Sequence, residues 1–286
     1  MSSPGPFHAT VQNQSGGLPL WSEPSASRVF DFRLPILARS VALLRVLLQD
    51  GIVDLELVSS VIALDPGLTY RVLQLANRDL PDDRDRIWQL PLAIVTAGRE
   101  NLDELLDEAW QIEFVDSERS VAQSLITEAV LRAALAQALA CELASCSPRK
   151  CFLSGLLFEL PALVTFSDPV RIDSHAMLLS DMCHSLPVAI VRAALAEIAS
   201  KAGPTDSMSA IVLIAQELLQ AGRLGDLSLE DLAGQPFWRP WSSLPMLQRR
   251  KILYRCSAIM AWVSKNLYHV HPWEFMAQLE NQIACE

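Results

Sequence analysis

Histidine offers the widest choice of chemistry in this sequence, because imidazole binds metal ions and transfers protons near neutral pH. The chain has five histidines; His269 and His271 form a His-x-His pair, and His184 stands beside a Leu-Pro step. A His-x-His pair on its own is more often part of a loop than a metal site, and we assign no ligand role to these three residues. The Gly-x-Ser-x-Gly elbow of serine hydrolases is absent, as are the glycine-rich loops that bind phosphates. These patterns therefore predict no catalytic centre.

Basic and aromatic side chains alternate near the C-terminus, and together they could bind single-stranded nucleic acid by charge and stacking. The set comprises Arg239, Arg249, Arg250, Lys251, Arg255 and Lys265, with Trp238, Trp241, Tyr254, Trp262 and Trp273. A second interpretation is a helix whose aromatic rings dock on the core while its charges face water. A third is a protein interface, because Trp and Arg are favoured anchors. We slightly favour the third, with Trp238 and Trp241 as candidate interface residues in a proline-rich loop.

The composition indicates a protein with a large core and an acidic surface. Hydrophobic residues make up 51% of the 286 residues and charged residues 20%, with a formal net charge of −10. An acidic chain argues against partners such as nucleic acid or an anionic membrane. The apolar run over residues 129–144 contains Arg132, Gln137 and Glu142, so it is too short and too polar to span a bilayer. Six cysteines without a Cys-x-x-Cys pattern are interpreted as reduced core thiols of a cytoplasmic protein.

Residues 57–77 are the segment around which the other elements are arranged. Apolar side chains recur at helical spacing over residues 57–64 and again over residues 68–75, which predicts two amphipathic helices. Pro66 disfavours the α conformation at Asp65 and suits the first position of a new helix. Asp65 is then the N-cap of the second helix. The backbone chemistry of this dipeptide therefore predicts a sharp corner.

This corner and its surroundings resemble the HDOD domain, a helical signalling domain of bacteria related to the HD phosphohydrolases. The matching residues are Leu34 and Pro35 before the first helix, Asp65, Pro66 and Leu68 at the corner, Ala76 and Asn77 after it, and Gly155, Leu156 and Leu157 further on. A serine usual after the Ala-Asn pair is replaced here by Arg78. The resemblance covers roughly residues 30–225 and implies an all-α fold.

The resemblance also implies where an HD hydrolase would hold its metal ions. The His-Asp pair would align with Phe158 and Glu159, the upstream histidine with Glu128 and the downstream pair with Glu197. Phenylalanine has no lone pair to donate, and imidazole and carboxylate are the ligands that such ions require. Three glutamates could still hold Mg²⁺, but we favour exposed or helix-capping roles for them. We therefore expect no metal, no cofactor and no enzymatic activity.

Periodicity elsewhere predicts only helices. The first follows Leu34-Pro35, with Leu37, Val41, Leu44 and Leu48 on one face. Others are predicted over residues 87–97, 102–114, 117–144, 150–166 with a kink at Pro161, 173–183, 187–201, 207–221, 247–268 and 272–285. No segment keeps a period of two, so no sheet is expected. The charged segment 78–86 is interpreted as a solvated loop.

These elements divide the chain into three parts. Residues 1–28 are interpreted as a disordered leader without the features of a signal peptide. Residues 29–225 form the HDOD-like domain, with an N-terminal subdomain over 29–116 and a degenerate HD-like bundle over 117–225. Residues 226–286 form a helical C-terminal extension.

The function expected from this reading is non-catalytic signalling or scaffolding through contact with another protein, or with a second copy of the chain. The resemblance further implies a bacterial regulatory network, with a link to cyclic dinucleotides. Two alternatives remain open: a divergent HD-type metal phosphohydrolase acting on a nucleotide, and a nucleic-acid-binding regulator that uses the C-terminal basic and aromatic residues.

Overall fold

The computed structural model describes residues 34–49, 54–80, 83–112, 121–167, 174–195, 206–224 and 233–284. The predicted leader, Glu197 and Cys285 lie outside these ranges. Within them the chain is all-α apart from two short strands, which confirms the predicted fold class.

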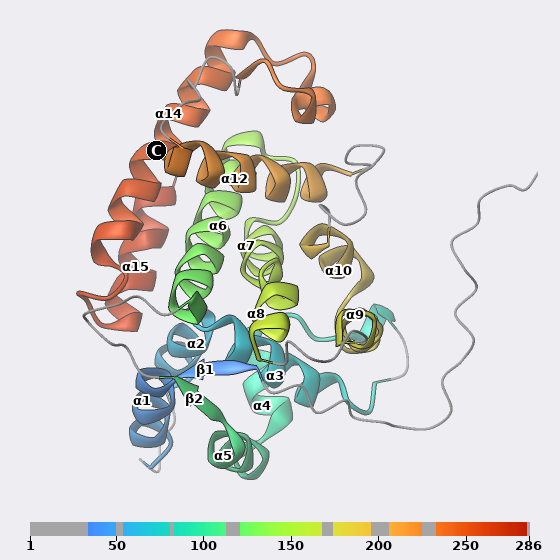
Figure 1. Cartoon of the computed structure of the whole chain (residues 1–286), viewed down its shortest axis with the longest axis vertical. Helices are drawn as coiled ribbons and strands as arrows, with labels where there is room; N and C mark the ends of the chain where they lie inside the picture. Colours follow the sequence, from blue (N-terminus) through green and yellow to red (C-terminus); the bar gives the residue numbers. More distant parts are fainter. Residues whose placement is uncertain are drawn as a thin grey trace, which may run out of the picture.

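The N-terminal helices surround the predicted corner (Figure 1). The elements are β1 (Pro35–Leu37), α1 (Ala38–Gln49), α2 (Leu55–Ala63), α3 (Pro66–Asn77), the 3₁₀ turn η1 (Asp83–Asp85), α4 (Leu90–Ala97), α5 (Arg99–Glu108) and β2 (Trp110–Ile112). The predicted face of α1 is confirmed, because Val41, Leu44 and Leu48 are buried. The corner is also confirmed: α2 ends at Ala63 and α3 begins at Pro66.

The expectation of no sheet is wrong in one place. β1 and β2 pair in parallel, with Pro35 opposite Trp110 and Leu37 opposite Ile112. Strands of three residues are too short for a period of two to appear in the sequence. The helix expected over residues 102–114 is also corrected. Helix α5 ends at Glu108, and the short strand β2 follows from Trp110.

The remaining helices form the central bundle and the C-terminal part of the molecule (Figure 1). They are α6 (Val121–Leu143), α7 (Pro148–Leu157), α8 (Leu160–Ser167), α9 (Ser174–Ser185), α10 (Val188–Ala194), α12 (Ser207–Leu224), the 3₁₀ segment η3 (Pro236–Trp241), α14 (Met246–Asn266) and α15 (Pro272–Ile283). The single helix expected over residues 150–166 is instead two helices, with the break at Phe158 and Glu159. Pro161 is the second residue of α8, where its missing N–H is not needed.

Two hydrophobic cores cross the boundaries drawn from the sequence. One core joins α1–α5 to residues of α7–α10, and the other joins α6, α7 and α12 to α14 and α15. The C-terminal helices are held in place by polar contacts as well: Arg39 on α1 donates to the carbonyl of Val270 at 3.0 Å, and the hydroxyls of Thr127 and Tyr268 lie 2.6 Å apart. The C-terminal helices are therefore part of the packed molecule.

Helix α6 passes through the centre of the bundle in Figure 1. It is the one helix in the described part of the chain with the length and composition of a membrane span, but 72% of its most apolar window is buried inside the protein. The burial shows that α6 serves as a core helix.

Candidate functional site

The buried carboxylate of Asp65 joins two elements of the N-terminal subdomain, α3 and β1. Its Oδ1 accepts a hydrogen bond from the N–H of Leu68 at 3.0 Å, which confirms the predicted N-cap. Its Oδ2 accepts from the N–H of Leu37 in β1 at 2.8 Å. Burial raises the pKa of Asp65 to about 6, although these backbone N–H groups favour the ionised form. The carboxyl thus ties β1 to the corner.

Steric crowding explains why the Asp-Pro-Gly-Leu corner has a glycine at position 67. A Cβ on Gly67 would lie 2.6 Å from the carbonyl oxygen of Pro35, a backbone atom that cannot move without disturbing β1. The Leu-Pro and Asp-Pro-Gly-Leu motifs are therefore parts of one contact, and both have structural roles.

Asn77 closes the end of α3. Its side-chain amide donates to the carbonyls of Leu73 at 2.9 Å and Ile87 at 2.7 Å, and its Oδ1 accepts from the N–H of Ile87. The preceding Ala76 is buried in the core that joins α1–α5 to residues of α7–α10. These contacts hold residue 87 against α3.

The segment 78–86 is not simply a solvated loop, and the prediction is corrected there. The side chain of Arg86 is 10% exposed and donates to the carbonyl of Leu186 at 2.8 Å. Asp83 accepts a hydrogen bond from the N–H of Val188 at 2.8 Å, at the start of α10. The charged residues thus connect the corner to α9 and α10, which sequence spacing does not reveal.

Gly155, Leu156 and Leu157 lie where α7 packs against α6. A Cβ on Gly155 would come within 3.0 Å of the Cα of Ala133, so the glycine permits a close approach of two helix backbones. Leu156 and Leu157 are both fully buried but belong to different cores. This part of the motif therefore places the end of α7 between the two cores.

The positions that align with the HD metal pair lie at the end of α7, and they face Arg132. The guanidinium carbon of Arg132, on α6, lies 4.4 Å from the centre of the Phe158 ring. Its Nη2 donates to Oε1 of Glu159 at 2.5 Å, and its Nε donates to Oε1 of Gln216 on α12 at 2.8 Å. The Arg132 residue is 0% exposed and Glu159 is 8% exposed. A protein cation therefore sits beside the Phe158–Glu159 pair, where the HD alignment places metal ligands.

The expectation that Glu159 is exposed or capping is corrected by this ion pair. A buried carboxylate needs a partner, because desolvation of an unpaired charge is costly, and Arg132 supplies it. Glu128 lies on α6 one turn before Arg132 and is half-buried. No group of three or more His, Cys, Asp or Glu side chains in the described ranges is arranged to hold a metal. Within the described ranges, the carboxylate at this centre is therefore paired with a cation of the protein itself.

Arg132 is the residue that sequence reasoning missed. In the sequence it only interrupts an apolar run, and nothing local marks its partners, which lie 27 and 84 residues away. The signal that could have found it is a single arginine in the middle of a mostly apolar, alanine-rich helix, because a charged side chain buried there needs an acidic or polar partner.

A second buried polar cluster was also missed. The hydroxyl of Tyr70 on α3 donates to Asp181 on α9, and Nε2 of Gln74 donates to the same oxygen at 2.7 Å. Burial raises the pKa of both Asp181 and Tyr70. The cluster links the N-terminal subdomain to α9.

The proposed interface role of Trp238 is contradicted by its burial. Trp238 is 1% exposed and belongs to the core formed with α6, α12 and α14, and the ring of Trp241 lies 6.3 Å from it in an edge-on arrangement. Trp238 therefore packs as core, and the half-buried ring of Trp241 packs against it, because η3 folds back onto α12.

The basic residues near the C-terminus fall into two groups. Arg249 donates to the carbonyls of Leu244 at 3.1 Å and Ser242 at 3.2 Å, and Arg255 pairs with Glu142 on α6. These two arginines hold the C-terminal part together. The remaining basic side chains are exposed: Arg239, Arg250, Lys251 and Lys265.

The aromatic residues of this segment also mostly pack internally. Trp262 stacks on Phe275 with ring centres 5.2 Å apart, and Trp273 stacks on His271 at 4.6 Å. Tyr254 differs from them, since it is 73% exposed. The aromatic side chains named here, all within the described ranges, form no row of exposed rings of the kind that a nucleic-acid strand stacks on.

Comparison with known proteins agrees with this architecture. The HDOD domain model matches residues 34–169. Two crystal structures of the MmoQ response regulator from Methylococcus capsulatus strain Bath are similar in fold: one is 20% identical, covers 77% of this chain and 91% of that chain, and has a TM-score of 0.53. The other is 19% identical, covers 78% and 99%, and has a TM-score of 0.56. No curated protein matches the chain. The motifs around the corner and the matched model together place an HDOD domain over residues 34–169 of the chain, and the helical fold agrees with this.

Proposed function

We propose that this protein is a non-catalytic, cytoplasmic signalling module of a bacterium that acts by binding another protein. The observation that carries the proposal is the Arg132–Glu159 pair. A guanidinium that lies against both Phe158 and Glu159 neutralises the one carboxylate of the HD-aligned pair and donates a charged hydrogen bond to its Oε1. The fold shared with the MmoQ response regulator supports a signalling role.

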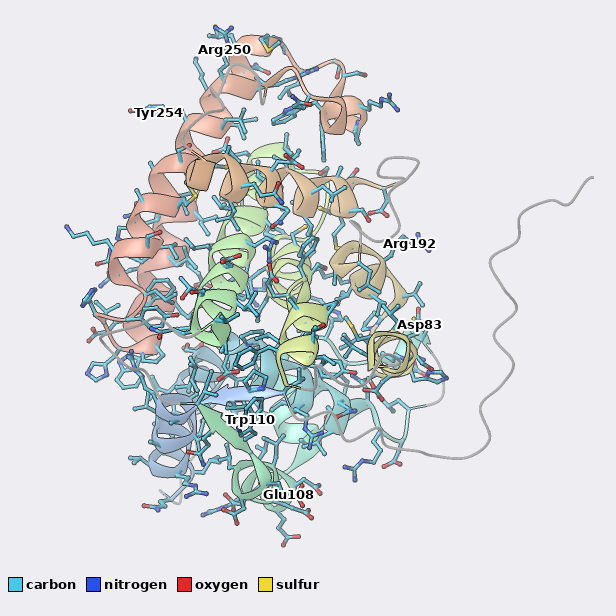
Figure 2. All side chains as sticks on the ribbon, in the orientation of Figure 1. Asp83, Glu108, Trp110, Arg192, Arg250 and Tyr254 are labelled. Atoms are coloured by element: carbon cyan, nitrogen blue, oxygen red, sulfur yellow. The ribbon has the colours of Figure 1, made fainter. Side chains whose placement is uncertain are left out.

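The surface that we propose for the partner is the exposed face of α14, defined here by Leu247, Arg250, Lys251 and Tyr254. Leu247 is 64% exposed and Tyr254 73% exposed, and they lie two helical turns apart on one face. Figure 2 shows Arg250 and Tyr254 projecting outward from the ribbon of α14. Exposed apolar and aromatic side chains beside basic ones suit a partner surface that combines a hydrophobic pocket with acidic residues.

The test compares variants of the α14 face with a variant elsewhere. Leu247→Asp and Tyr254→Ala should melt like the wild type and lose at least about tenfold in affinity for the partner, as expected when hot-spot residues are truncated. The partner would first be identified by pull-down from the native host with mass spectrometry, and then measured as a purified protein. Val46→Asp is the matched control, because Val46 is 62% exposed but lies on α1. Equal loss of affinity in the control, or none in the α14 variants, would reject this surface.

The absence of catalysis is tested separately. Protein purified without added metal should contain far less than one Mn, Fe or Zn per chain, and it should not hydrolyse cyclic dinucleotides or nucleotides with Mn²⁺ or Mg²⁺ added. Near-stoichiometric metal together with hydrolysis that a chelator abolishes would replace the proposal with the phosphohydrolase alternative.

A further inference from the structure

Two cysteines meet at the turn between α6 and α7. The turn follows Ala144, whose φ of 47° is in the left-handed region that ends a helix. Cys146 directly precedes Ser147, the N-cap of α7, and Cys151 is the fourth residue of that helix. The Sγ atoms of Cys146 and Cys151 lie 3.1 Å apart.

This contact follows from the geometry of a helix start. Residues immediately before the N-cap often pack against the fourth helical residue and fix the direction in which the chain enters the helix. Here both residues of that pair are thiols. A disulfide bond is about 2.05 Å long, so the two sulfur atoms need to approach by only about 1 Å to form one.

The two thiols are not equivalent. Cys146 is half-buried and Cys151 is fully buried. The hydrogen bond from Cys151 lowers the pKa of Cys146 to about 7, against a smaller opposing effect of burial, and the same contact together with burial raises the pKa of Cys151. One thiol is thus accessible and readily ionised, and its protonated neighbour lies behind it.

The other cysteines of the described ranges have different surroundings. Burial raises the pKa of Cys183 on α9, and it raises the pKa of Cys256 on α14 to about 12. Cys141 on α6 lies close enough to Cys151 to influence its ionisation. Cys183 and Cys141 therefore provide internal references for reactivity and for the position of a cross-link.

We propose that Cys146 and Cys151 form a dithiol site that low-molecular-weight disulfides oxidise reversibly to an intramolecular disulfide. The Cys146 thiolate attacks one sulfur of the small disulfide, which forms a mixed disulfide and releases one thiolate that takes up a proton. Cys151 then attacks the Cys146 sulfur and expels the second small thiol, to which its proton passes. The two cysteines lose two electrons and two protons, and the small disulfide gains them as two thiols.

The product would join the turn after α6 covalently to the first turns of α7. This helix carries Gly155 and ends at the Phe158–Glu159 pair, so the bond would fix one end of the helix that leads into the Arg132 centre. The proposal is independent of the function proposed above, because it concerns a modification and not a partner.

The first measurement treats the reduced full-length protein with oxidised glutathione. Trypsin cuts after Arg149 and Lys150, so the bond would link peptide 133–149 to peptide 151–171. Peptide 133–149 also contains Cys141, and therefore the Cys141→Ser variant must still give the link. We expect the cross-linked pair in most molecules and its complete loss on treatment with dithiothreitol.

Variants at the two sites separate the steps. Cys151→Ala should stop the reaction at the mixed disulfide of Cys146 with one glutathione, and Cys146→Ala should prevent the reaction of this pair. In the wild type, iodoacetamide at pH 7 should modify Cys146 at least about tenfold faster than Cys183, since the thiolate is the reactive form. Wild-type protein that gives no link between the two peptides, or that gives one only through Cys141, would overturn the proposal without requiring either alanine variant to fold.

Discussion

Single side chains in this protein connect segments that are far apart in the sequence, and Asp65 is the clearest case. It caps α3 and also binds the N–H of Leu37, 28 residues away. Its folded-state pKa of about 6 lies above the ordinary value of 3.8, so the folded state binds the proton more tightly than the unfolded state. The contribution of this group to the free energy of unfolding is therefore greatest below pH 3.8 and falls as the pH rises to about 6.

The first prediction concerns this pH window. Asp65→Asn removes the titrating group, so the wild type should lose stability relative to the variant between pH 3.8 and about 6, and the difference should be constant above that range. Denaturant unfolding at a series of pH values measures the difference. A ¹³C NMR titration that places the carboxyl of Asp65 at or below its ordinary pKa would contradict the prediction.

The second prediction concerns the Arg132–Glu159 pair. Removing either partner leaves a buried charge without its counter-ion, so Glu159→Gln and Arg132→Met should each cost about 3–5 kcal/mol of unfolding free energy. The double variant Arg132→Met with Glu159→Gln should cost much less than the sum, because no charge then remains in the core. Denaturant unfolding of all four proteins completes the cycle. Additive single effects would show that the two side chains are not coupled.

At the scale of elements, the packing of α6 against α7 positions that pair. Gly155 lets the helix backbones approach, with the Cα of Ala133 and the carbonyl oxygen of Arg132 each 3.0 Å from where a Cβ would be. The same approach brings Arg132 to the end of α7.

The third prediction follows from this close approach. Gly155→Ala should destabilise the protein by about 1–3 kcal/mol, because the added methyl group meets backbone atoms that can only move with their helix. The gain in helix propensity from Gly to Ala is smaller, about 1 kcal/mol. Arg149→Ala, an exposed change on α7, serves as the control. Thermal and denaturant unfolding would contradict the prediction if Gly155→Ala were as stable as the wild type.

At the scale of the whole molecule, the C-terminal segment completes the second core. Trp238 lies with Leu253 and Phe275 in the core that surrounds α6. The guanidinium carbon of Arg249 lies 5.7 Å from the centre of the Trp238 ring. The segment therefore contributes to the stability of the bundle as well as to its surface.

The fourth prediction separates these two contributions. Trp238→Ala should reduce the free energy of unfolding by about 3–5 kcal/mol, as large-to-small changes of aromatic core residues do. Tyr254→Ala, at a position that is 73% exposed, should stay within about 0.5 kcal/mol of the wild type. Equal stability of both variants in denaturant would restore the interface interpretation of Trp238.

The sequence by itself determined the features that depend on near neighbours. The corner at Asp65-Pro66 and the buried face of α1 follow from proline sterics, helix capping and a period of 3.6 residues, all of which act within one or two turns. The all-α class follows from the same periodicity, and the HDOD resemblance depends on motifs at these positions.

Only the tertiary structure decided which distant residues meet. Arg132 pairs with Glu159, 27 residues away, and β1 pairs with β2 across a still longer stretch of chain. The burial of Trp238 depends on how η3 folds onto α12. No local pattern encodes such contacts, because they arise when helices pack and desolvated charges must find partners.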